Sequence, residues 1–62
     1  MLKINIKTGG SAFHEEGEKV DEYGRIELIR ILQKIENEIE DGYDKHYIMD
    51  INGNKVGEWE LE

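Results

Sequence analysis

The chain has no cysteine and no cluster of residues with the spacing of a structural zinc site, and its only serine is Ser11. Disulfides and structural zinc are therefore excluded as sources of stability. A chain of 62 residues buries only about 60% of the surface that its unfolded form exposes. A single serine without cysteine also offers no convincing Ser-His or Cys-His arrangement for nucleophilic catalysis. We therefore expect one domain spanning residues 1–62, no enzymatic activity, and a homodimer that supplies the missing burial.

Long apolar runs are also missing. No stretch approaches the ~20 apolar residues that a membrane span requires. The chain starts at Met1 with an alternating pattern, not with a basic region followed by an apolar run of secretory length. We expect a cytoplasmic protein that does not enter a membrane.

Basic residues are scarce: eight stand against fifteen acidic ones, and the formal net charge is −7. A surface with this much negative charge repels the phosphate backbone of nucleic acids. We therefore do not expect the protein to bind nucleic acid directly. Acids at a helix C-terminus are unfavourable by roughly 0.3–1 kcal/mol each, so those at the end of the predicted helix do not stabilise it. They form either a solvated face or a surface complementary to a basic groove, such as one that holds DNA or RNA. The acids of this group are Glu36, Glu38, Glu40, Asp41 and Asp44.

The N-terminal residues predict a strand followed by a loop. Leu2, Ile4 and Ile6 alternate with polar residues, which is typical of a strand with one wet face. The Gly9-Gly10 pair then breaks the pattern. Phe13 follows in a polar stretch, and we expect it to pin the loop to the core; the alternative is a contact residue exposed for a partner.

Residues 21–41 predict an amphipathic helix, because apolar residues recur with helical spacing. Asp21 is the expected N-cap and Gly42 the expected C-terminal stop, whereas Gly24 should weaken the first turn. The apolar stripe is Leu28, Leu32, Ile35 and Ile39, with Ile31 beside it. Ile26 and Ile29 widen it, which suggests a second contact surface, such as a second copy of the chain.

Two apolar-rich segments, 46–51 and 55–61, flank Asn52-Gly53 and predict a β-hairpin. A two-residue loop would pair Met49 with Val56. A loop one residue longer, or a bulge at Gly57, aligns the larger apolar groups on the side that the helix covers, which is the register we expect. That face would carry Tyr47, Met49, Ile51, Trp59 and Leu61. Ile48 and Val56 would then lie on the opposite face, and Trp59 is expected in the core.

The predicted fold is α+β: a β-α-β-β chain that forms a three-stranded sheet with one amphipathic helix packed on one face. The first strand runs either antiparallel to the last strand or parallel to the second one. Acidic residues on the last strand would protect an exposed sheet edge from pairing with other chains. This favours the parallel arrangement, in which the last strand is outermost.

No motif supplies convincing chemistry. His14, Glu15 and Glu16 are adjacent and do not converge on one ion, and the segment from Asp50 to Asn54 lacks the glycine and glutamate positions of a calcium loop. Gly9-Gly10-Ser11 resembles the start of a phosphate-binding loop, but it has no downstream Gly-Lys-Ser/Thr and an acidic continuation. We expect no metal site and no cofactor.

Three segments together carry a resemblance: Thr8-Gly9-Gly10-Ser11-Ala12-Phe13, the Ile31-Leu32-x-x-Ile35 helix and Ile48 to Trp59. They resemble a group of very small phage and prophage proteins, over nearly the whole chain. These motifs are structural, and the loop between His14 and Asp21 is longer and more acidic here than in the group. The resemblance implies a phage accessory protein located in the host cytoplasm, and such small acidic proteins commonly block a bacterial defence protein.

We therefore predict a non-enzymatic anti-defence inhibitor whose partner is a host protein with a basic surface, for example a defence protein that handles nucleic acid. The predicted electrostatic contacts are Glu36, Glu40, Asp41 and Asp44, with Tyr43 as an aromatic contact. One alternative is a nucleotide-signal sponge that binds a small molecule at a dimer seam through the Gly9-Gly10 backbone and Phe13. A passive structural or assembly module is the other.

Overall fold

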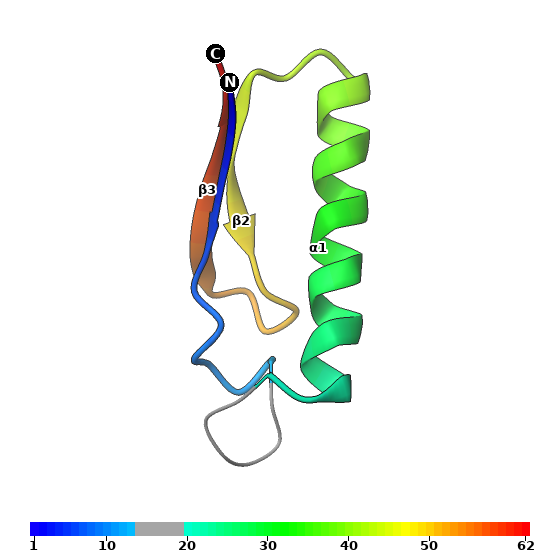
Figure 1. Cartoon of the computed structure of the whole chain (residues 1–62), viewed down its shortest axis with the longest axis vertical. Coiled ribbons are helices and arrows are strands. Elements are labelled where there is room, and N and C mark those ends of the chain that lie inside the picture. Colours follow the sequence, from blue (N-terminus) through cyan, green and yellow to red (C-terminus); the bar gives the residue numbers. More distant parts are fainter. Residues whose placement is uncertain (14–19) are drawn as a thin grey trace.

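One helix lies along one face of a three-stranded sheet, so the molecule has two layers (Figure 1). The computed structural model describes residues 1–13 and 20–62. Its elements are β1 (Leu2–Ile6), α1 (Glu22–Glu40), β2 (Lys45–Met49) and β3 (Lys55–Leu61). The predicted α+β class and element order are confirmed. Within the described residues no helix is both long and apolar enough to cross a membrane.

The strand order is β1-β3-β2, with both outer strands antiparallel to β3. The parallel arrangement favoured by the sequence is therefore wrong. The acids of the last strand do not protect an edge, because β3 is the central strand. Glu60 instead lies between two lysines, paired with Lys3 on one side and Lys45 on the other. Opposite charges at such cross-strand positions stabilise a sheet.

The hairpin turn is a three-residue loop, one residue longer than the minimal Asn-Gly turn. Asp50 N–H donates to Asn54 O at 2.9 Å, and Gly53 N–H donates to Asp50 O at 3.0 Å. Gly53 has φ +82°, which favours glycine. The buried Asp50 carboxylate accepts the N–H groups of Asn52 and Asn54, each at 2.9 Å. The predicted longer loop is confirmed.

The prediction of which hairpin side chains point toward the helix is partly wrong. Ile48, Val56 and Trp59 are all buried in the core, whereas Tyr47 and Met49 are exposed. The register shifts between Ile48 and Met49, so that Val56 on β3 has no partner on β2. This bulge lets Val56 and Trp59, three positions apart, both face the helix. The prediction that Ile48 and Val56 lie on the face opposite the helix is therefore wrong, because His46, not Tyr47, pairs with Trp59.

The helix begins and ends as predicted but is rotated about its axis. Asp21 caps its start by accepting Gly24 N–H at 2.9 Å. The buried positions are Gly24, Glu27, Ile31 and Ile35, whereas Leu32 is 47% and Ile39 36% exposed. The predicted stripe was off-centre because a charged residue occupies the buried face. Glu27 Oε2 accepts Ile51 N–H at 2.7 Å, and its carboxylate pairs with Arg30.

Phe13 and Ala12 pin the loop after β1 to the core, as predicted. They are 0% and 1% exposed. Gly24 makes this packing possible, because a Cβ at that position would lie 1.6 Å from Phe13 O. The glycine predicted to weaken the helix is therefore required for the close approach of helix and loop.

Candidate binding surface at the C-terminal end of the helix

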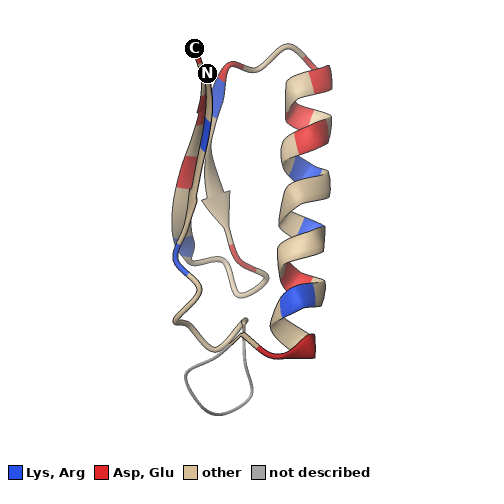
Figure 2. Cartoon of the chain, viewed as in Figure 1, with Lys and Arg blue, Asp and Glu red and all other residues tan. Residues whose placement is uncertain are grey.

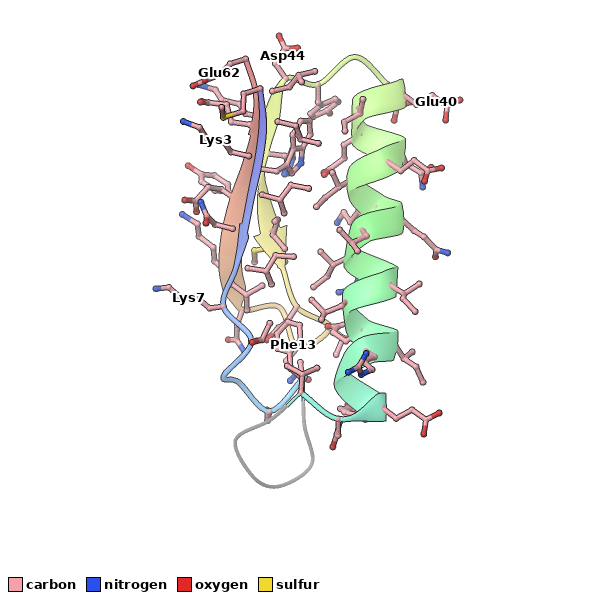
Figure 3. All side chains as sticks on the ribbon, viewed as in Figure 1. Lys3, Lys7, Phe13, Glu40, Asp44 and Glu62 are labelled. Carbon is pink, nitrogen blue, oxygen red and sulfur yellow. The ribbon has the colours of Figure 1, made fainter. Side chains whose placement is uncertain are left out.

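The five predicted contact residues lie where α1 ends and the chain turns into β2. All are exposed. Figure 2 shows acidic segments gathered at this end of the helix, and Figure 3 shows Glu40 pointing away from the sheet and Asp44 at the tip of the molecule. The structure thus brings Glu36, Glu40, Asp41, Tyr43 and Asp44 to one end, although nothing in it tests whether they bind a partner.

The backbone of this corner is fixed by hydrogen bonds. Gly42 N–H donates to Ile39 O and Tyr43 N–H to Glu38 O, both at 3.0 Å. Gly42 has φ +93°, so this pair of bonds forms a Schellman motif at the end of the helix. The position of Tyr43 follows from the motif, and its side chain is 49% exposed.

The charges at this end lack internal compensation. The last turn of α1 contains no basic residue. Among the described residues, no salt bridge involves Glu36, Glu40, Asp41 or Asp44. The helix dipole places a partial negative charge at the same end, so these carboxylates make the local electrostatic potential still more negative. Such a surface favours a cationic partner.

Glu38, the fifth acid of the group, has a structural role. Its Oε1 accepts Trp59 Nε1–H at 3.0 Å, and its Oε2 lies 3.4 Å from His46 Nδ1. The His46 ring in turn lies 5.5 Å from the Tyr43 ring, centroid to centroid. This chain of contacts links the candidate surface to the core tryptophan. No local pattern indicates this chain of contacts, because it depends on packing between residues 21 positions apart.

A second surface lies on the sheet face opposite the helix. A shallow depression of about 430 Å³ is lined mainly by Lys45, Tyr47, Glu58 and Glu60. Lys55 Nζ lies 4.3 Å above the centre of the Tyr47 ring, a cation–π contact. Both signs of charge alternate here, so the depression has no clear preference for an anion or a cation.

The residues proposed for small-molecule chemistry are arranged unfavourably or lie outside the described part. Phe13 is fully buried, so its ring cannot stack on a ligand at the surface. Neither Gly9 nor Gly10 adopts a positive φ. His14, Glu15 and Glu16 fall outside the described residues. Within residues 1–13 and 20–62 no group of three potential metal ligands is found.

The chain matches no protein-family model, no curated protein and no solved structure.

Proposed function

We propose that the protein is a small acidic phage or prophage accessory protein that binds a bacterial defence protein in the host cytoplasm and inhibits it by contact. The phage assignment rests on the resemblance of the sequence motifs. The mode of action rests on one observation: four exposed carboxylates without a salt bridge among the described residues lie around Tyr43 at the end of the helix. The protein acts without catalysis, metal or cofactor.

In this proposal the acidic end occupies a basic groove of the partner that otherwise accepts nucleic acid. Complementary charge mainly accelerates encounter and selects the partner. Tyr43 supplies the contact energy that surface charges alone do not, since exposed ion pairs are worth about 0–1 kcal/mol each. The Schellman motif fixes the main-chain conformation at Tyr43 before the partner binds. This reduces the conformational entropy that is lost on binding.

The test compares two sets of charge-removing variants in affinity capture from phage-infected cells. In the first set, Glu36→Gln, Glu40→Gln, Asp41→Asn and Asp44→Asn remove four charges with little change of shape. The control, Glu58→Gln with Glu60→Gln, removes charge from the opposite sheet face. The proposal predicts that the captured defence protein is lost with the first set, and with Tyr43→Ala, but kept with the control. Equal capture by both charge sets contradicts it.

The nucleotide-sponge alternative is less well supported because Phe13 is buried. It predicts a rise in the melting temperature when nucleotides are added. Our proposal predicts no such shift. A passive assembly module remains the third alternative, and it predicts no inhibition of any captured protein.

A further inference from the structure

The outer side of β1 is an unpaired sheet edge. Glu62 N–H donates to Met1 O at 2.9 Å and Lys7 N–H to Val56 O at 2.8 Å. Because hydrogen-bonding direction alternates along an antiparallel strand, the main-chain groups of Leu2, Ile4 and Ile6 point away from β3. Within residues 1–13 and 20–62, none of these three residues forms a main-chain hydrogen bond on that side.

The other edge of the sheet is partly covered. Arg30 Nη2 donates to Met49 O at 3.2 Å, at the free edge of β2. The helix also lies nearest to β2. Consequently β1 is the more accessible of the two edges.

The same side of the molecule carries exposed apolar side chains. Leu2 and Ile4 pair with Leu61 and Trp59, so they face the helix layer. The helix leans toward β2 and leaves them 46% and 37% exposed, and Leu61 42% exposed. Leu28, Leu32 and Ile39 lie on the helix flank opposite Arg30, which by helical spacing is the flank toward β1.

Much of the apolar surface of the described residues is exposed. More large apolar side chains are exposed than buried among the described residues.

We propose that a second copy of the chain covers this surface by pairing β1 with β1 of its partner, antiparallel, about a two-fold axis at Ile4. The result is a continuous sheet in the order β2-β3-β1-β1-β3-β2 with both helices on one face. This inference does not depend on the proposed function. It adds to the expected homodimer a specific surface and register.

The charges on β1 select the register. With Ile4 opposite Ile4 of the second copy, Leu2 faces Ile6 and Lys3 faces Asn5. A shift by two residues in one direction sets Lys3 against Lys3, and in the other direction sets Lys3 against Lys7. Like charges directly opposite destabilise a sheet. The Ile4-centred register is the one of the three that avoids them and pairs all three apolar residues.

The absence of native cysteine allows a direct test by oxidative cross-linking. In the proposed register the Cα atoms of two Ile4→Cys copies lie about 5.5 Å apart, within reach of a disulfide. The matched control is Tyr47→Cys, whose main-chain groups point outward on the β2 edge. At ~10 µM protein we expect I4C to link roughly 100-fold faster than Y47C, since paired cysteines react at millimolar effective concentration.

A second pair of variants reads the register. Lys3→Cys mixed with Asn5→Cys should form a mixed disulfide, whereas K3C alone should not, because its two Cα atoms are about 8 Å apart. Efficient linkage of K3C alone contradicts the Ile4-centred register.

The mass of the unaltered protein in solution, measured by light scattering, keeps the proposal testable if a variant fails to fold. We expect about twice 7.3 kDa. A monomer at ~10 µM, the concentration at which the cross-linking rates are compared, overturns the proposal and would leave the edge for a strand of a different protein.

Discussion

Replacing Gly24 by alanine should destabilise the protein, against the ordinary rule for helices. Alanine in place of an exposed helical glycine stabilises by about 1 kcal/mol. Here the new Cβ would lie 1.6 Å from Phe13 O, 2.5 Å from Phe13 C and 2.7 Å from Val20 Cγ1. The first two atoms are backbone, so rotation of a side chain cannot relieve the clash.

The size of the effect follows from what must move. Overpacking costs about 1–3 kcal/mol, and displacing the fully buried Phe13 adds part of the 3–5 kcal/mol that loss of a buried Phe typically costs. After subtracting the propensity gain, we expect a net loss of about 2–3 kcal/mol. That is a large share of the roughly 3–9 kcal/mol expected for 62 residues.

Urea unfolding at pH 7, followed by the fluorescence of Trp59, measures this loss. The control is Gly10→Ala, because a Cβ there meets nothing within 4 Å and φ is not positive; it should be neutral or stabilising by about 0.4–1 kcal/mol. If G24A stabilises the protein by about 1 kcal/mol, the close approach of helix and loop described above is refuted.

Three further predictions concern the sheet and the buried charge. Gly57→Ala places a Cβ 1.8 Å from Asn5 O, so it should separate β1 from β3; faster hydrogen exchange at Lys3 and Asn5 checks this, and unchanged exchange contradicts it. Asp50→Ala removes the acceptor of two N–H groups at 2.9 Å and should lower the free energy of unfolding by about 1–3 kcal/mol, with Asp44→Asn as the control. The hydrogen bond from Arg30 holds the pKa of Glu27 below its ordinary value of 4.5. The ionised form therefore stabilises the fold above pH ~4.5, and this contribution is lost as the pH falls through the lower folded pKa. Glu27→Gln should be less stable than the unaltered protein at pH 7, and the difference should shrink toward pH 3; parallel pH profiles would contradict it.

Local signals predicted the elements well. Alternation at Leu2, Ile4 and Ile6, an N-cap at Asp21 and the Asn52-Gly53 turn each depend on a few neighbouring residues, and the structure contains all three. The placement of Phe13 was also predictable, because a lone aromatic in a polar loop gains most by burial.

Local patterns did not predict which side chains point toward the core, nor the order of the strands in the sheet. The bulge beside Val56 changes which side chains of β3 face the helix. A bulge at Gly57 was predicted only as an alternative to the longer loop, whereas the structure contains both a bulge and the longer loop. The burial of Glu27 depends on Arg30 and on the main chain of Ile51, so counting apolar residues misplaced the helix stripe. The candidate surface was predicted as a group of exposed residues, yet its support through Glu38, His46 and Trp59 required the fold.

The most direct test of the proposed function is the association rate of the protein with its captured partner, measured by stopped flow between about 50 and 500 mM salt. Surface charges are screened over about 10 Å at 0.1 M salt and about 3 Å at 1 M. We expect a rate that falls steeply with salt for the unaltered protein, and a low, nearly flat rate for the variant lacking the four charges at the end of α1. Equal rates and equal salt dependence for both proteins would show that these carboxylates do not direct binding.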